Sequence, residues 1–241
     1  MPERQREKTG QQGQGIEGVP HQYRITVSVG PDAEGDDRNV RRGRIERLSE
    51  EIKATPVRWL GDSKTYASLN QKHGLSGDYV ISAVDSTNKS SIGYGPCIGI
   101  VAAGRSNDGL DKNISLLVHA IPNLISSYSF VKDLTGRLAE LKAQSEEDTT
   151  DVVIFGGNAE NKYNNPDPYY RNQHLESLAE LVRLVRFVLS VDPRVFDPAT
   201  GGFTDVVFEN DQRRLHMTRE AHQKIPETLE QSGSEILKKV L

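Results

Sequence analysis

Two short apolar runs, separated by a loop of turn-forming residues, are the feature of this sequence that most constrains the fold. The first run, CIGIVAAG, begins at Cys97, and the second, ISLLVHA, carries His119 near its end. Each run is shorter than a typical helix, and the intervening GRSNDGLDKN is rich in Gly, Asn, Asp and Ser, which favour turns. We therefore expect the two runs to pair as an antiparallel hairpin.

The expected hairpin brings the only cysteine of the chain to a histidine. A turn centred on Asp108 and Gly109 places Ala102 opposite Ile114 and Cys97 opposite His119. Side chains opposed on one face of such a pair have Cβ atoms ~5 Å apart, which is within reach of a thiol and an imidazole. A slip of one residue would put the two side chains on opposite faces of the sheet.

The remaining periodicity predicts interleaved strands and helices. Alternating or continuous apolar residues predict strands over 21–30, 78–84 and 151–155, and a hairpin formed by 203–208 and 213–217. Apolar residues at helical spacing predict helices over 126–143 and 175–189, and a highly charged segment over about 41–54 predicts a short helix. We expect the α/β class, with a mixed β-sheet flanked by helices.

Composition divides the chain into one domain with two extensions. Residues 1–20 contain almost nothing to bury, so we expect a disordered tail. We assign residues 21–217 to one α/β domain and residues 218–241 to a C-terminal helical extension interrupted near Pro226.

Charge and hydropathy exclude several classes of partner. A net charge of −4 gives no electrostatic argument for nucleic acid binding, and no run approaches the about 18 apolar residues of a membrane helix. The opening MPERQREKTG lacks the apolar region of a secretory signal, and one cysteine fits a reducing compartment, so we expect a cytoplasmic protein. The arginines of the charged segment could dock a protein partner or form a solvated helix face; they are Arg41, Arg42, Arg44 and Arg47.

Residue types alone leave two interpretations of Cys97 and His119. A thiol reacts as thiolate and needs a base or cation beside it, which His119 could supply. A lone cysteine is also commonly a small buried hydrophobe, and a histidine in an apolar run is commonly a core residue. We expect no metal site, because His174, His216 and His222 are far apart in the chain and there is no Cys-x-x-Cys pair.

Several blocks of this sequence resemble the CheD family of bacterial chemoreceptor glutamine deamidases, in the same order. GYGPCIGIVAAG is similar to that family's loop and strand around the catalytic cysteine, and SLLVHAIPN to its second strand with the catalytic histidine. VVIFGGNAE is similar to its Phe-Gly-Gly strand end, and Arg171-Asn172 to the Arg-Asn pair that opens the next helix. The resemblance covers residues 78–217 and implies a compact α/β sandwich.

The resemblance implies the residues of a catalytic site. It implies Cys97 as nucleophile, His119 as base, and Ser91 as the hydroxyl residue that supports the pair. Pro96 replaces a serine of the family and has no N–H, so the amide of Cys97 itself would have to hold the oxyanion. We place Gly95, Gly156 and Gly157 with Cys97 around that oxyanion and the substrate, and expect no metal or organic cofactor.

The function that follows from the resemblance is protein glutamine deamidation. The chain would convert an accessible Gln of a partner protein to Glu through a thioester on Cys97, with a regulatory protein as a further possible partner. The alternative is a catalytically inactive CheD-like module that binds a partner protein. A third possibility is a secreted effector related in mechanism to deamidating toxins of the cytotoxic necrotizing type.

Overall fold

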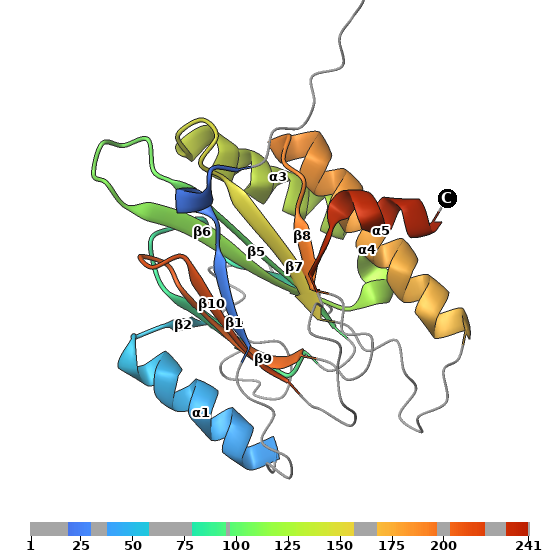
Figure 1. Cartoon of the computed structure of the whole chain (residues 1–241), viewed down its shortest axis with the longest axis horizontal. Coiled ribbons are helices and arrows are strands. Elements are labelled where there is room, and N and C mark those ends of the chain that lie inside the picture. Colours follow the sequence, from blue (N-terminus) through green and yellow to red (C-terminus); the bar gives the residue numbers. More distant parts are fainter. Residues whose placement is uncertain are drawn as a thin grey trace, which may run out of the picture.

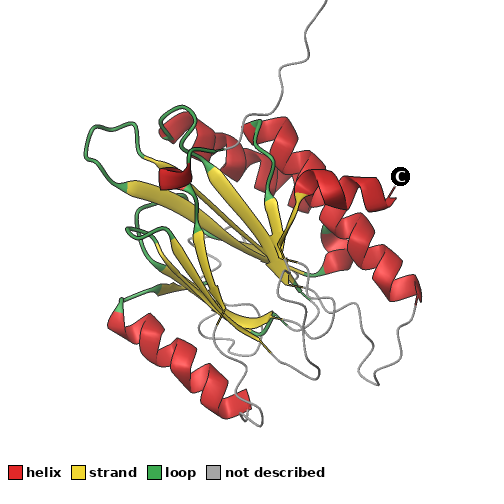
Figure 2. Cartoon of the chain, viewed as in Figure 1, coloured by secondary structure: helices red, strands yellow, loops and turns green. Residues whose placement is uncertain are grey.

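The computed structural model describes residues 19–29, 38–57, 79–94, 97–156, 168–196, 203–219 and 230–240. They form two β-sheets packed face to face, with helices on both outer faces (Figures 1 and 2). The expected α/β class is confirmed at this level. The four helices of the described residues are α1 (Arg38–Glu51), α3 (Tyr128–Gln144), α4 (Pro168–Leu189) and α5 (Gly233–Val240).

Both sheets contain parallel and antiparallel neighbours. The smaller sheet has the order β1-β10-β9-β4-β2, and α1 packs against it. Its strands are β1 (Thr26–Val29), β2 (Thr55–Pro56), β4 (Lys89–Ile92), β9 (Phe203–Glu209) and β10 (Arg214–Arg219). The larger sheet has the order β11-β8-β7-β5-β6-β3, and α3 and α4 cover its outer face. Its strands are β3 (Tyr79–Ile81), β5 (Ile98–Arg105), β6 (Asn113–Ala120), β7 (Asp151–Gly156), β8 (Arg194–Phe196) and β11 (Glu230–Ser232).

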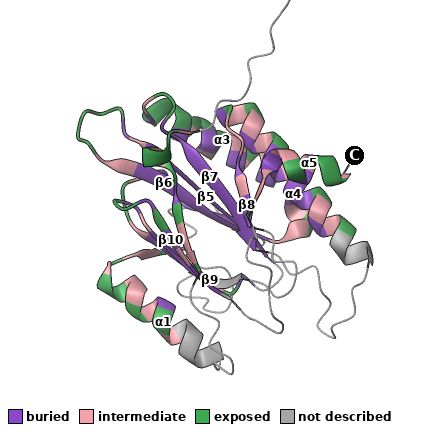
Figure 3. Ribbon diagram, viewed as in Figure 1, coloured by how far each residue is buried: buried purple, intermediate pink, exposed green. Residues whose placement is uncertain are grey.

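The central strands of the larger sheet are buried on both faces, which explains why their sequences are continuously apolar (Figure 3). Along β5, Ile98 and Ile100 point into the core beneath the helices, whereas Val101 points into the core between the sheets. β6 and β7 alternate in the same way, so odd-numbered positions of β5, β6 and β7 face the smaller sheet.

The expected hairpin of β5 and β6 is present, but the predicted register is wrong by two residues. Ala102 lies opposite Leu116, and His119 lies opposite Gly99 instead of Cys97. The hydrogen-bonded ladder continues beyond the strands to Ser106, whose N–H donates to the Lys112 carbonyl at 2.8 Å. The turn between β5 and β6 is therefore shorter than predicted, and its centre lies one residue further along the chain. A shift of two residues in pairing keeps each side chain on its predicted face.

Other sequence predictions differ from the structure mainly in short elements. The predicted helices over 126–143 and 175–189 correspond to α3 and α4, and the predicted hairpin near the end corresponds to β9 and β10. The strand expected over 21–30 is shorter, because residues 21–23 form a 3-10 helix and the strand β1 begins only at Thr26. The two-residue β2 and the strands β4, β8 and β11 were not predicted, since segments of two to four residues carry almost no periodicity.

Both chain extensions lie partly outside the described residues. Of the expected tail, only Val19 and Pro20 are described. The C-terminal extension contributes a strand as well as a helix: β11 pairs with β8, and Ile236 of α5 is fully buried against the helical core. In α1, Arg44 and Arg47 are exposed, and the side chains of Arg41 and Arg42 lie outside the described part of the chain.

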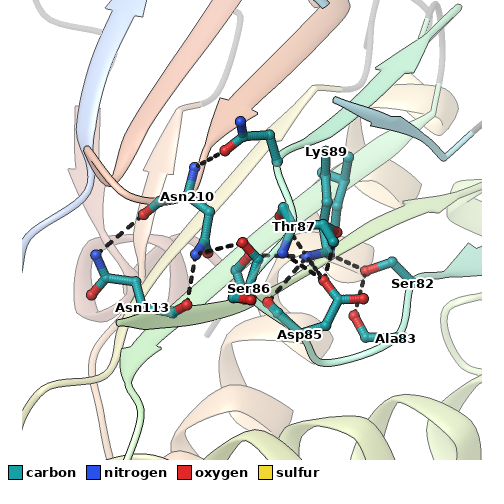
Figure 4. A network of polar contacts seen from close by, with 11 residues as sticks. Ser82, Ala83, Asp85, Ser86, Thr87, Lys89, Asn113 and Asn210 are labelled. Carbon is teal, nitrogen blue, oxygen red and sulfur yellow. Dashed lines mark hydrogen bonds and ion pairs between the residues drawn. The ribbon is translucent and has the colours of Figure 1, made fainter. Parts of the chain in front are cut away.

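A polar network joins the two sheets at the end where β4 and β6 begin (Figure 4). The Lys89 ammonium is almost completely buried, and it donates to Asp85 Oδ1 at 2.8 Å, to the Thr87 carbonyl at 3.0 Å and to Ser115 Oγ at 3.1 Å. Beside it, the Asn210 side chain donates to the carbonyls of Ser86 and Asn113. Burial lowers the pKa of Lys89, and the hydrogen bond that Lys89 donates to Asp85 opposes that change. Lys89 is thus a satisfied buried cation that links the sheets.

Replacing Asp85 by Asn should destabilise the fold by at least about 2 kcal/mol, because it leaves a buried ammonium without its counter-charge. Asp108→Asn is a matched control. Each aspartate accepts a hydrogen bond from the backbone N–H two residues ahead, and each carboxylate lies 2.8 Å from the ammonium of a lysine four residues ahead. The side chains of Asp85 and Asp108 are 40% and 39% exposed. Their lysines differ, since Lys89 is 1% and Lys112 is 36% exposed. Asp108→Asn should have a much smaller effect, because water screens an ion pair between exposed side chains. Urea unfolding of both variants measures the difference, and equal losses would contradict the role of burial.

Candidate functional site

Cys97 lies immediately before β5, at the end of the sandwich opposite the Lys89 network. Its side chain is 1% exposed and belongs to the core between the sheets, with Val101 and Phe155. Its backbone N–H donates to the Tyr94 carbonyl at 2.5 Å. The Cys97 amide, which is predicted from the sequence to hold the oxyanion, therefore already donates its hydrogen bond to another acceptor.

His119 and Ser91 meet across the two sheets. His119 lies near the end of β6 and Ser91 in β4, and both side chains are buried. Ser91 Oγ and His119 Nδ1 are 3.0 Å apart and hydrogen-bonded. The two residues are 28 positions apart in the chain, so packing of the smaller sheet on the larger one creates this contact.

Cys97 is a diagonal neighbour of His119 on the inner face of the larger sheet. Gly99 is the direct cross-strand partner of His119, and Cys97 precedes Gly99 by two residues on the same face. Diagonal neighbours have Cβ atoms roughly 7–8 Å apart, compared with about 5 Å for direct partners. The structure thus brings both groups to one face, but in a different relation from the predicted direct opposition.

An aromatic residue, Tyr94, completes the surroundings of His119. Its ring stacks on the imidazole with centroids 3.9 Å apart and an interplanar angle of 13°. The Tyr94 ring fits over position 99 only because residue 99 is glycine. A Cβ at this position would lie 2.8 Å from Tyr94 Cε1 and 2.3 Å from Phe155 Cζ. Gly99 is thus required for the two rings to lie above β5.

Burial determines the protonation states of the candidate pair. It raises the pKa of the Cys97 thiol to about 12, and it lowers the pKa of the His119 imidazole to about 3. The proton therefore stays on sulfur and the imidazole is neutral at pH 7. This order of pKa values is the reverse of that in a thiolate–imidazolium pair.

The predicted glycines are placed only in part. Gly156 ends β7 with a φ of +92°, and a Cβ added to it would lie 2.7 Å from the Cys97 carbonyl oxygen. Both the left-handed backbone and the close approach require glycine there. Gly95, Pro96 and Gly157 lie outside the described residues.

Two residues of the site were not singled out from the sequence. Tyr94 stands between Gly93 and Gly95, three residues from both Ser91 and Cys97, and an aromatic residue within a glycine-rich loop was the available signal. Asp205 of β9 is buried, and its Oδ1 accepts the N–H of Gly93 at 2.9 Å, which ties the loop to the smaller sheet. An acidic residue between the apolar residues of a predicted strand was the signal for Asp205.

The described part of the chain contains neither a cluster of metal-binding side chains nor a helix that could span a membrane. Within it, no three His, Cys, Asp or Glu side chains gather closely enough to bind a metal ion. His174 and His216 lie in α4 and β10, and His222 is not described. No helix among the described residues combines the length and apolarity needed to cross a membrane.

Comparisons with known proteins identify no family for this chain. No family model matches it, and no solved structure matches it. A segment is 30% identical over 130 residues to hemicentin-1 of the mouse, Mus musculus. This segment is 52% of the present chain and 2% of hemicentin-1, so the likeness is confined to a small part of that much longer protein.

The stability of the protein should fall as the pH drops below about 6.5, because the unfolded chain then protonates His119 while the folded chain does not. The folded pKa of about 3 implies that this loss continues down to about pH 3. His119 alone should account for about 2 kcal/mol between pH 6.5 and pH 5, at roughly 1.4 kcal/mol per pH unit.

The measurement is urea unfolding of the wild type and of His119→Gln across this pH range. The variant should show a flatter dependence. His216→Gln is the comparison, since His216 is only partly buried and Glu209 opposes the fall of its pKa. Identical pH dependence of wild type and His119→Gln would contradict a neutral buried imidazole.

Proposed function

We propose that this chain is a CheD-like, cysteine-dependent glutamine deamidase that converts a Gln side chain of a partner protein to Glu. The observation that carries the proposal is the 3.0 Å contact between Ser91 Oγ and His119 Nδ1, on the inner face that Cys97 also occupies. These are the three residues that the resemblance implies as catalytic. The proposed setting is the cytoplasm, with a protein substrate and a regulatory protein as possible partners.

The reaction proceeds in two balanced halves. In the first, His119 accepts the proton of the Cys97 thiol as sulfur attacks the carboxamide carbon of Gln. His119 then returns this proton to the leaving nitrogen, the C–N bond breaks, and ammonia departs from the thioester. In the second half, His119 takes a proton from a water molecule as the water oxygen attacks the thioester carbon. The C–S bond breaks, sulfur regains the proton, and Glu is released.

Two features of the site determine what substrate binding must do. Cys97 is 1% exposed, so the thiol has to become accessible to the Gln side chain. The amide of Cys97 donates to the Tyr94 carbonyl, so it can hold the oxyanion only if that bond opens. A carboxamide in the site would also replace part of the apolar surroundings that keep the thiol protonated.

The second candidate function is a catalytically inactive module that binds a partner protein. The burial of both Cys97 and His119 favours it, because a buried thiol with a pKa of about 12 is inert in the absence of a cation. In this case Cys97 and His119 would serve only as packed core residues between the sheets.

Alkylation of Cys97 by chloroacetamide, a small carboxamide electrophile, should depend on His119. Because Cys97 is the only cysteine, intact mass measures its modification alone. If His119 acts as base, His119→Ala should slow alkylation by about tenfold or more, and Ser91→Ala should slow it to a lesser extent. Circular dichroism and thermal unfolding identify variants that have lost their fold, and His119→Gln provides a second substitution. Alkylation as fast in both His119 variants as in wild type would favour the inactive module.

Deamidation itself is measured with a library of peptides that each contain one Gln, in water enriched in oxygen-18. We expect release of ammonia and Glu that carries the heavy oxygen, and loss of both in Cys97→Ala. Conversion that persists in Cys97→Ala would overturn the proposal.

A further inference from the structure

One buried residue, Tyr94, lies against both of the groups that the proposed reaction uses. Its ring stacks flat on the His119 imidazole with centroids 3.9 Å apart, and both residues are fully buried. Its backbone carbonyl accepts the N–H of Cys97, which is 1% exposed. The Tyr94 ring therefore covers one face of the imidazole, and the Tyr94 carbonyl occupies the amide of the cysteine.

The carbonyl of Tyr94 has the same chemistry as the group that the proposed substrate would present. A Gln side chain carries a carboxamide oxygen, and this oxygen would accept the Cys97 N–H as sulfur attacks the carbon. The Tyr94 carbonyl oxygen already accepts this N–H at 2.5 Å. Because a backbone amide has a single N–H, the two oxygens compete for one donor. The substrate can use this amide only after Tyr94 has left it.

Two hydrogen bonds hold Tyr94 in this position. Its hydroxyl donates to the Val118 carbonyl at 3.0 Å, and the N–H of the preceding Gly93 donates to Asp205 Oδ1 at 2.9 Å. Gly93 has a φ of +83°, which is a left-handed backbone conformation. Glycine adopts this conformation and the common ones at similar cost, so a rotation at Gly93 is less restricted than it would be at another residue.

We infer that Tyr94 is an autoinhibitory residue, which has to move away from His119 and Cys97 before the site can react. One movement would uncover the imidazole and free the Cys97 N–H, because a single residue occupies both. Ser91 belongs to β4, and its direct contact with His119 would keep the base oriented after Tyr94 has moved. The part that Tyr94 plays in catalysis rests on the proposed function, whereas closure of the thiol by Tyr94 does not.

The competing explanation is that Tyr94 only fills the core between the sheets, and that Cys97 reacts only when the whole chain unfolds. Tyr79 of β3 provides a matched control. Both tyrosines are at most 2% exposed, and each ring meets a phenylalanine ring edge-on, with centroids 5.1 Å apart for Tyr94 and 5.2 Å apart for Tyr79. The Tyr79 hydroxyl also donates a hydrogen bond, to Asp133 Oδ2 at 2.7 Å. Tyr79 differs in its place, since it belongs to the core beneath the helices.

The experiment measures the rate of alkylation of Cys97 by chloroacetamide in wild type, Tyr94→Phe and Tyr79→Phe, with intact mass as the readout. Tyr94→Phe keeps the ring but loses the hydrogen bond to Val118. Its alkylation should be about fivefold faster than that of wild type, because loss of one hydrogen bond raises the population of the open state by about this factor. Tyr79→Phe should lower the global stability as well, but its alkylation rate should stay within about twofold of wild type.

The urea dependence of the wild-type rate is a second measurement, which does not require a variant. Movement of one residue exposes little surface, so the rate should hardly change at urea concentrations below the unfolding transition. A rate that rises with urea as steeply as the equilibrium for global unfolding would overturn the inference. Alkylation that is no faster in Tyr94→Phe than in Tyr79→Phe would overturn it too.

The same rates distinguish this inference from the proposed function. If Tyr94→Phe accelerates alkylation but the His119 variants react as fast as wild type, Tyr94 closes a thiol that has no catalytic base. The inference then stands and the proposed deamidase fails. If alkylation depends on His119 but is equally fast in Tyr94→Phe and Tyr79→Phe, the inference fails and the proposed function stands.

Discussion

The pairing of β5 with β6 is the constraint on which the rest of this structure depends. Eight consecutive residue pairs join the two strands, and β7 pairs with the other edge of β5. Since these strands are buried on both faces, a slip of one residue would exchange the helix-facing and sheet-facing side chains of the whole layer. The same register brings Cys97, His119 and Gly156 to one end of the larger sheet.

Polar contacts between the sheets add direction to an interface that is otherwise apolar. β4 reaches β6 twice, through Lys89 to Ser115 and through Ser91 to His119. Apolar packing has little directional preference, whereas a buried polar group without a partner costs about 1–3 kcal/mol. The two contacts therefore favour one position of the smaller sheet over the larger one. The candidate site consequently depends on how the sheets pack as well as on the hairpin.

Burial has opposite consequences for the position and for the reactivity of the candidate pair. The packing that holds His119 between Ser91 and Tyr94 also removes the water that would stabilise a charged imidazole or thiolate. The site as folded is thus ordered but uncharged. For the proposed deamidase, the contacts of His119 with Ser91 and with the Tyr94 ring would set the orientation of the base in advance, and the substrate would have to supply the polar surroundings for the ion pair. A binding module would need no such change, because its Cys97 and His119 would stay buried.

Local pattern in the sequence was sufficient for the elements whose periodicity is long. The two central strands, the helices α3 and α4 and the last hairpin follow from apolar spacing, because side chains of a strand or helix must face a core at regular intervals. The register of β5 and β6 did not follow. It depends on left-handed backbone at Gly109 and Asp111, which sets the turn, and composition does not specify which turn residues adopt it.

The sequence by itself determined which residues could carry chemistry, since one cysteine, one histidine in an apolar run and one preceding serine are visible in it. Only the tertiary structure decided their relation. Ser91 meets His119 because two sheets formed by distant segments pack face to face. Asp205 meets the loop before Cys97 because β9 pairs with β4 within the smaller sheet. The contacts of Tyr94 were decided in the same way. Its ring stacks on His119 and its hydroxyl donates to the Val118 carbonyl, and both contacts arise from tertiary packing.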